Sequence, residues 1–194
     1  MTHMHSAIYE IRFHGRGGQG VVSAAAVLAL AVFENGYETQ AFPKFGSERR
    51  GAPVEAYVRI AQRPIRTHTQ IYTPDVVIIQ DATLMHCASV FDGLKPGGNI
   101  ILNSAGTIKT QFLNHEAYQC LTIAANDIAQ KHLSRPLPNM VLLGAFAAIS
   151  DYASINTLKT AIAGHLQSKG KKIVQSNVDA MMEGYETAIN GIGT

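Results

Sequence analysis

The sequence contains no tryptophan and only two cysteines, Cys87 and Cys120, among its 194 residues. A disulfide framework, or an iron–sulfur cluster held by four thiolates, cannot be built from two cysteines of one chain. We therefore predict that both are buried free thiols and that the chain holds no redox centre of its own.

Charged residues are also scarce, at 15% of the sequence against 46% hydrophobic residues. This is less charge than a typical free-standing soluble domain carries, so we expect partners to cover part of the surface. Sixteen Lys and Arg against fourteen Asp and Glu give a net charge of +2. That balance does not favour binding to nucleic acid, and any anion site must be local.

No apolar run is long enough for a membrane span. The longest extends from Val21 to Phe33 and is interrupted by Ser23, whereas a span needs about 20 residues. The start of the chain has no basic segment leading into an apolar stretch, so we predict no secretory signal and a cytoplasmic location. Residues 1–7 are expected to be flexible, and their histidines are not expected to bind metal.

Strand-like and helix-like segments alternate along most of the chain. The expected strands are 8–14, 37–42, 54–60, 75–80, 99–102 and 119–123. The expected helices are 21–35, 83–91, 139–150, 155–169 and 178–189. The order predicts one α/β domain over 1–194: an open, mostly parallel sheet with helices on both faces, a Rossmann-like three-layer sandwich. Ligands of such sheets bind beyond the carboxyl ends of the strands.

A glycine-rich loop, Gly-Arg-Gly-Gly-Gln-Gly, follows the first predicted strand and precedes the first helix. Glycines in this setting let backbone N–H groups approach a phosphate at the helix N-terminus. An NAD site also needs an acidic residue at the end of the second strand, where the sequence has Gln40. A tight packing turn is the other alternative. The candidate phosphate-binding residues are Gly15, Arg16, Gly17, Gly18, Gln19 and Gly20.

A second unusual loop, Ala41 to Pro53, combines cations, aromatic residues, glycines and prolines. Arginines offer forked donors to phosphate oxygens, and an aromatic ring offers a flat face to a base. The alternative is that Glu48 pairs with one arginine while the loop docks on a neighbouring subunit. The candidate ligand-binding residues are Phe45, Gly46, Arg49 and Arg50, with Lys44 as an additional charge.

Other titratable residues form no catalytic or metal-binding pattern. Asp81, His86, Asp127 and His132 have no pairwise spacing that specifies acid–base chemistry or metal ligation. We predict no catalytic residue and no metal site on this chain.

The two loop segments, GRGGQGVVSAAAVLA and AFPKFGSERRGAPVEAYVRI, closely resemble the gamma subunit, or the equivalent fused domain, of pyruvate-type 2-oxoacid:ferredoxin oxidoreductases. The later segments PDVVIIQD, LKPGGNIILN, PNMVLLGA and NVDAMMEGYETA are similar to the same family. The resemblance covers nearly the whole chain.

This resemblance implies a hetero-oligomer in which alpha, beta and ferredoxin-like delta subunits bind thiamine diphosphate, Mg and [4Fe-4S] clusters. The complex would decarboxylate a 2-oxoacid, pass electrons to ferredoxin or a similar acceptor, and transfer the acyl group to coenzyme A. The gamma domain is associated with positioning coenzyme A. The glycine loop and the second loop are therefore its expected binding site, with Asn139 as a weaker addition that is equally typical of a helix cap.

Two other functions remain open from the sequence: a purely structural assembly subunit and an NAD(P)-binding dehydrogenase. The 2-oxoacid, whether pyruvate, branched-chain or aromatic, is not specified by this chain. Neither are the final acceptor and the subunit stoichiometry.

Overall fold

A computed structural model describes residues 8–44, 50–86, 89–106 and 118–192. Its centre is a six-stranded sheet with the order β2-β3-β1-β4-β5-β6. Strands β1, β4, β5 and β6 are mutually parallel, while β3 runs antiparallel to both β1 and β2. Five residues named above lie outside the described residues: Phe45, Gly46, Glu48, Arg49 and Cys87.

The elements follow the predicted order closely. The strands are β1 (Tyr9–Arg16), β2 (Glu38–Pro43), β3 (Pro53–Ala61), β4 (Val76–Ile79), β5 (Asn99–Asn103) and β6 (Gln119–Ile123). The helices are α1 (Val21–Glu34), 3-10 helix η1 (Ala82–His86), α2 (Ala125–Leu133), α3 (Asn139–Ile149), α4 (Ile155–Leu166), 3-10 helix η3 (Gln167–Lys169) and α5 (Lys171–Ile192). Helix α2 was not predicted, and α5 begins earlier than the expected 178.

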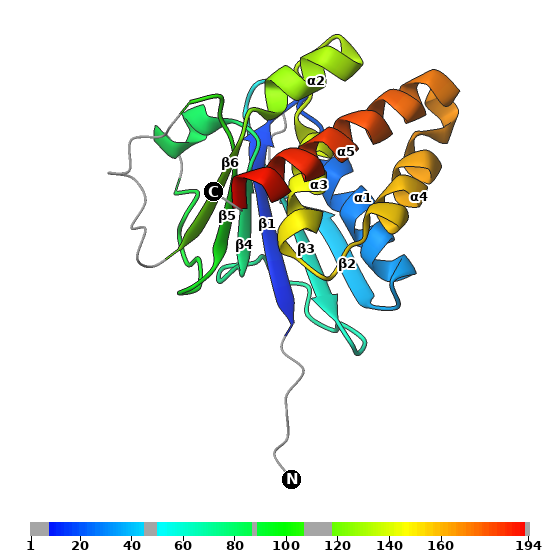
Figure 1. The fold of residues 1–194 in the computed structure, drawn as a ribbon. Helices are drawn as coiled ribbons and strands as arrows, with labels where there is room; N and C mark the ends of the chain where they lie inside the picture. Colours follow the sequence, from blue (N-terminus) through cyan, green and yellow to red (C-terminus); the bar gives the residue numbers. More distant parts are fainter. Residues whose placement is uncertain (1–7, 45–49, 87–88, 107–117, 193–194) are drawn as a thin grey trace.

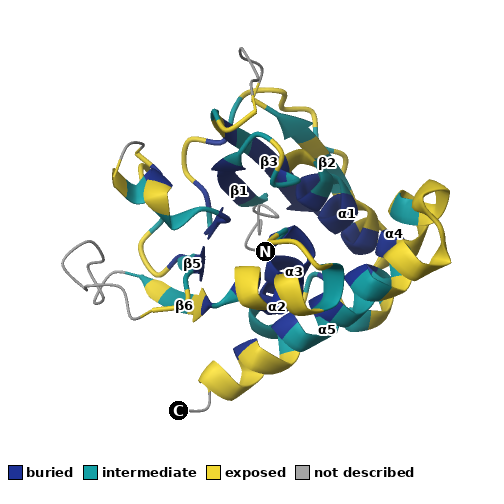
Figure 2. Cartoon of the chain, turned by 90° about the horizontal axis from the view of Figure 1, so that it is seen from above, coloured by how far each residue is buried: buried dark blue, intermediate teal, exposed yellow. Residues whose placement is uncertain are grey.

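Helices α1 to α5 are stacked in two tiers on one face of the sheet (Figures 1 and 2). Helix α3 is apolar on all sides and its first eight residues, Asn139 to Phe146, are buried. It lies between the sheet and α5, and glycines allow the close approach of the two helices. A Cβ at Gly144 would stand 2.0 Å from the Met181 carbonyl oxygen, and one at Gly184 would stand 2.2 Å from the Val141 carbonyl oxygen.

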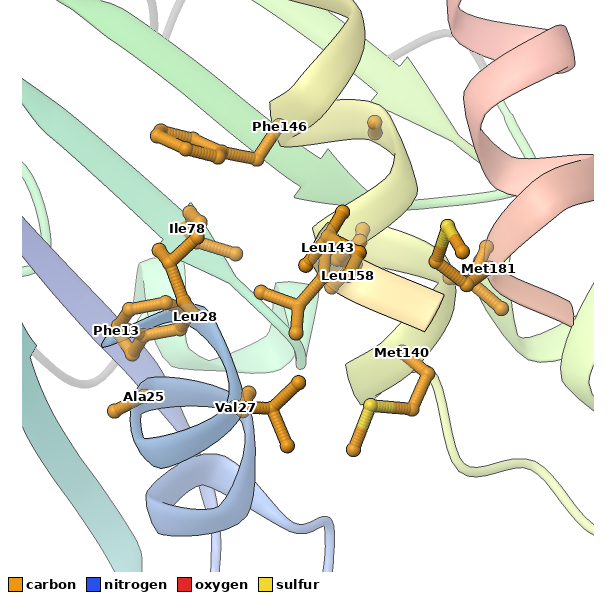
Figure 3. Packing of buried hydrophobic residues seen from close by; sticks show 14 of the residues in the cluster. Phe13, Ala25, Val27, Leu28, Ile78, Met140, Leu143, Phe146, Leu158 and Met181 are labelled. Carbon is orange, nitrogen blue, oxygen red and sulfur yellow. The ribbon is translucent and has the colours of Figure 1, made fainter. Parts of the chain in front are cut away.

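The main core lies between this face of the sheet and the helices. Phe13 of β1 and Ile78 of β4, which are partners in the parallel ladder, point toward the helices. Figure 3 shows how the surrounding side chains from α1, α3, α4 and α5 meet there, among them Leu28, Leu143 and Met181. Complete burial of these apolar side chains contributes about 1.5–3 kcal/mol each. The helix face of the sheet therefore holds most of the stabilising burial.

The opposite face of the sheet departs from the expected architecture. The α/β prediction is confirmed, but α1 to α5 all pack on the first face. Among the described residues, only η1 and connecting segments cover the second face. Beside β4 and β5 this cover is apolar, with Leu84, Val90 and Leu94 against the strands.

The half of the second face formed by β1 and β3 is polar instead. Arg59 is only 1% exposed and donates to Glu10 Oε1 at 2.8 Å and to the Thr69 carbonyl oxygen at 2.7 Å. Buried charges that are paired in this way tolerate a covering of loop backbone. The covering segments offer backbone carbonyl groups as hydrogen-bond acceptors, whereas the carbonyl groups of a helix are bonded within the helix.

Among the described residues, no helix has both the length and the apolar character needed to cross a bilayer.

Candidate functional site

The glycine loop lies at the topological switch point of the sheet. Its first two residues, Gly15 and Arg16, are the last two of β1. From β1 the chain proceeds through α1 to the β2–β3 side, while β4 lies on the other side of β1. The carboxyl ends of β1 and β4 are therefore neighbours. In open α/β sheets this position is where ligands bind, and Gly15 to Gly20 occupies it as predicted.

The structure brings the second loop against the glycine loop. Gly17 and Arg50 form an isolated parallel bridge. The Gly17 N–H donates to the Ala52 carbonyl oxygen at 2.9 Å, and the Gly51 N–H donates to the Gly17 carbonyl oxygen at 3.1 Å. The two sequence motifs are thus parts of one backbone surface, although more than thirty residues separate Gly17 from Arg50.

Helix α1 presents backbone donors without intrahelical acceptors at this edge. Gly20 occupies the N-cap position with φ 74°, provides no side-chain cap, and is followed by a first turn without acidic residues. The Ala24 N–H is bonded to the Gly20 carbonyl oxygen, so the N–H groups of residues 21–23 lack acceptors within the helix. Such a terminus attracts negative charge.

Arg16 is tied to its own chain rather than directed to solvent. Its Nε lies 3.2 Å from Asp81 Oδ2, its Nη1 donates to the Gly51 carbonyl oxygen at 3.1 Å, and its Nη2 donates to Thr83 Oγ1 at 2.7 Å. Its side chain is 29% exposed. The guanidinium therefore cross-links the glycine loop, the second loop and the β4–η1 connection.

Gln19 fixes the inside of the glycine loop. Its Oε1 accepts from the Arg16 N–H at 2.7 Å, and its Nε2 donates to Asp81 Oδ2 at 2.9 Å. Asp81 also accepts from the hydroxyl and the N–H of Thr83. Burial opposes ionisation of Asp81, but the bonds from Thr83 and Gln19 and the charge of Arg16 outweigh it, so its pKa lies below the ordinary value.

The remaining predicted cations differ in their surroundings. Lys44 forms an ion pair with Glu55 at 2.9 Å. Arg50 is exposed, and within the described part of the chain its guanidinium has no hydrogen-bond or ion-pair partner. Arg50 is therefore the described cation of the two loops that is available to an external anion.

The amide side chains of Asn139 and Gln80 lie against the glycine loop. Asn139, the first residue of α3, donates from Nδ2 to the Gly20 carbonyl oxygen at 3.4 Å and does not cap its own helix. Gln80, directly after β4, is 0% exposed, and neither its Oε1 nor its Nε2 has a partner among the described residues. A Cβ at Gly15 would lie 3.2 Å from the Gln80 Cβ. The Gln80 side chain, whose amide has no partner among the described residues, therefore lies directly beside the glycine loop.

Arg12 and His14 of β1, directly before the glycine loop, form a buried pair of side chains. Arg12 Nε donates to His14 Nε2 at 3.0 Å, and the Arg12 guanidinium also donates to the carbonyl oxygens of Val90 and Asp92. Burial, with a contribution from the Arg12 charge, lowers the pKa of His14 to about 4. His14 is therefore a neutral acceptor, and the pair anchors the covering segment to β1.

The strand order argues against the dinucleotide alternative. In the usual NAD-binding arrangement the second strand lies next to the first, so that its end reaches the ribose. Here β3 separates β2 from β1, which places β2 about 10 Å away at the usual strand spacing. Gln40, at the expected acidic position, is bonded to Arg59 and His68.

The other titratable residues singled out from the sequence have separate environments. His132 Nε2 contacts Glu183 Oε2 at 2.6 Å, and Asp127 lies in the first turn of α2. Cys120 is a half-buried free thiol whose pKa is raised by burial. No group of three potential metal ligands occurs within the described residues. Asp81 is the residue that sequence reasoning set aside and the structure places at the site.

Comparison with known proteins identifies relatives over nearly the whole chain. The family model described as pyruvate ferredoxin/flavodoxin oxidoreductase matches residues 10–187. Pyruvate synthase subunit PorC of Methanothermobacter marburgensis is 47% identical over 177 residues, covering 91% of this chain and 96% of that protein. The pyruvate/ketoisovalerate oxidoreductases common subunit gamma of Thermococcus litoralis is 43% identical, with coverages of 93% and 97%.

Solved structures agree with these relatives. Pyruvate oxidoreductase subunit PORC of Thermotoga maritima superposes with a TM-score of 0.77 at 30% identity, covering 92% of this chain and 96% of that chain. The 2-oxoglutarate:ferredoxin oxidoreductase of Magnetococcus marinus, solved with 2-oxoglutarate, coenzyme A and succinyl-CoA bound, gives a TM-score of 0.79 at 25% identity. That match covers 93% of this chain but 31% of the other, so in that enzyme the domain is part of a longer polypeptide.

Proposed function

Because this chain belongs to the pyruvate ferredoxin/flavodoxin oxidoreductase family, we propose that it works as the gamma subunit of a 2-oxoacid:acceptor oxidoreductase and positions coenzyme A. The complex would convert pyruvate or a related 2-oxoacid to an acyl-CoA and reduce ferredoxin or a similar acceptor. The observation that carries the proposal is the bridge between Gly17 and Arg50. It joins the glycine loop and the second loop, whose residue types both suit phosphate, at the switch point of the sheet. A coenzyme A complex of a fused relative supports the choice of ligand.

The residues at this edge fit the phosphates of coenzyme A. The N–H groups of residues 21–23, which have no acceptor within α1, suit the diphosphate, since backbone donors and the helix dipole act together there. Gly15, Gly17, Gly18 and Gly20 keep the loop free of side chains that would cover those donors. Arg50 would bind the 3′-phosphate. Arg49, Phe45 and Gly46 stay predicted contacts to that phosphate and to the adenine. Asn139 would support Gly20 from behind.

Coenzyme A supplies the thiol that accepts the acyl group, and this chain acts by holding the opposite end of that molecule. Fixing the nucleotide restricts the thiol to a small volume, which makes acyl transfer an effectively intramolecular step. No proton transfer by this chain is required, so we assign it no catalytic residue. Thiamine diphosphate, Mg and the [4Fe-4S] clusters are assigned to alpha, beta and delta partner subunits.

One exposed face of α1 supports assembly with such partners. Val22, Leu30 and Phe33 lie on the same side of the helix and are 39%, 46% and 61% exposed. Large apolar side chains that gather on one helix face are typical of a surface covered in a complex. The low overall charge of the sequence agrees with this assignment.

The test replaces Arg50 with Ala in the assembled oxidoreductase. Loss of one charge-assisted hydrogen bond weakens binding by about 1.5–3 kcal/mol, so the KM for coenzyme A should rise about 10-fold or more. The KM for the 2-oxoacid should not change. Dephospho-coenzyme A lacks the 3′-phosphate, so its KM should be higher than that of coenzyme A in the parent enzyme. In Arg50→Ala the two KM values should become similar.

Arg66→Ala is the matched control, because Arg66 is also exposed but lies after β3, at the opposite edge of the sheet. It should leave every kinetic constant unchanged. If Arg50→Ala instead dissociates the subunits while the intact fraction keeps its KM for coenzyme A, the chain is a structural assembly subunit and the coenzyme A proposal is wrong.

A further inference from the structure

Asp81 accepts contacts from three directions at the carboxyl end of β4. Arg16 and Gln19 of the glycine loop both reach its Oδ2, at 3.2 and 2.9 Å, while Thr83 bonds to Oδ1. The Asp81 side chain is 17% exposed. Nothing in the proposed binding of coenzyme A uses this carboxylate directly, because a carboxylate repels phosphate.

The contacts form a closed circuit around the loop. The Arg16 N–H donates to Gln19 Oε1, Gln19 Nε2 donates to Asp81, and the Arg16 side chain returns to the same Asp81 oxygen. The circuit holds both ends of the turn between Arg16 and Gln19. From the same guanidinium, Nη1 extends the connection to Gly51 of the second loop.

We propose that Asp81 is a positioning residue for coenzyme A, acting through Arg16 and Gln19, and that Arg16 is a structural cross-link rather than a phosphate ligand. This inference rests on the proposed function and assigns the phosphates to backbone N–H groups and Arg50. Ionised Asp81 binds both side chains at one oxygen and so keeps the two loops in register. The electrostatic cost of its charge near phosphate is offset because Arg16 neutralises it at 3.2 Å.

The opposite role for Asp81 would be to mask Arg16. If Arg16 were a phosphate ligand restrained by Asp81, removing the carboxylate charge would release a cation into the site. Coenzyme A binding would then become tighter and more dependent on salt. A positioning role gives the reverse result, since the loop loses its anchor.

The experiment measures steady-state kinetics of the assembled oxidoreductase carrying Asp81→Asn. We expect the KM for coenzyme A to rise about 5- to 10-fold, the range expected when one charge-assisted hydrogen bond is weakened indirectly. The KM for the 2-oxoacid and the salt dependence of the KM for coenzyme A should stay unchanged. Asp151→Asn, at an exposed position between α3 and α4, is the matched control and should behave as the parent enzyme.

Arg16→Lys provides a second test that does not depend on the folding of the Asp81 variant. Lysine keeps the charge but cannot span Asp81, Gly51 and Thr83 with one planar fork. We expect Arg16→Lys to raise the KM for coenzyme A as much as Arg16→Ala does. The double variant Arg16→Ala/Asp81→Asn should be no worse than either single variant, because both remove the same circuit.

A lower KM for coenzyme A in Asp81→Asn, or full activity in Arg16→Lys with a defect in Arg16→Ala, would overturn the positioning role. An unchanged KM for coenzyme A in Asp81→Asn would also overturn it. The proposed function stands in each of these cases if Arg50→Ala still raises the KM for coenzyme A. It fails separately if none of the variants affects that constant.

Discussion

Replacing Gly20 with Ala tests how the loop is held at the start of α1. Gly20 has φ 74°, and a Cβ there would lie 2.4 Å from Asn139 Nδ2. The left-handed conformation costs a non-glycine residue about 1–2 kcal/mol. Displacing Asn139 also removes its bond to the Gly20 carbonyl oxygen, worth about 0.5–1.5 kcal/mol. We therefore expect Gly20→Ala to lower the free energy of unfolding by about 1.5–3.5 kcal/mol.

Gly97→Ala separates the two contributions. Gly97 has φ 76°, nearly the same as Gly20, but a Cβ there would meet no atom within 4 Å. It lies in the turn before β5, at the edge of the sheet opposite the glycine loop. Its substitution should cost only the conformational part, about 1–2 kcal/mol.

Urea denaturation of the purified subunit, followed by circular dichroism, measures both variants. In an Asn139→Ala background the excess cost of Gly20→Ala over Gly97→Ala should disappear. Gly20→Ala should also raise the KM for coenzyme A in the assembled enzyme, whereas Gly97→Ala should not. Equal destabilisation by the two substitutions would refute the steric contact with Asn139 on which this reasoning depends.

Two further predictions concern buried polar groups near the loop. His14, which faces Arg12, Glu55 and Lys44, has its pKa lowered from 6.5 to about 4; between these values the unfolded chain binds a proton that the folded chain does not. Stability should therefore fall as the pH falls from 6.5 to 4, by up to about 3 kcal/mol, and urea titrations of His14→Gln should show a flatter pH profile in that window. Gln80→Leu should raise the free energy of unfolding by about 1–3 kcal/mol, since a buried amide without a partner among the described residues is replaced by an apolar side chain. A loss of stability in Gln80→Leu would mean that this amide has a partner, such as a bound water, in solution.

The fold was largely predictable because the apolar patterns are strong and local. The bounds predicted for the strand Gln119–Ile123 agree with the structure. The helix predicted over 139–150 ends one residue earlier, at Ile149. Helix α2 was missed because it is short and five of its nine residues are polar, although Ala125, Ile128, Ala129 and Leu133 recur at helical spacing. The first part of α5 was missed because Lys171 and Lys172 are exposed, and apolar periodicity becomes clear only farther along.

The candidate site was predicted in its parts but not in its connections. Glycine spacing marks Gly15 to Gly20 whatever the fold, because it reports a requirement of the backbone. The neutralisation of Arg16 could not be predicted, since Asp81 is sixty-five positions away and reaches it only through the pairing of β1 with β4. The same applies to Gly17 and Arg50, which meet across two loops.

The sequence by itself determined the α/β class, the family and the two loops that mark the switch point, because apolar periodicity and glycine spacing are properties of short segments. Only the tertiary structure decided which cations are available to a ligand, which face of the sheet the helices cover, and that β3 separates β2 from β1. Those outcomes depend on contacts between residues far apart in the chain. A charge that is free in the sequence, such as that of Arg16, is neutralised when folding places a carboxylate beside it.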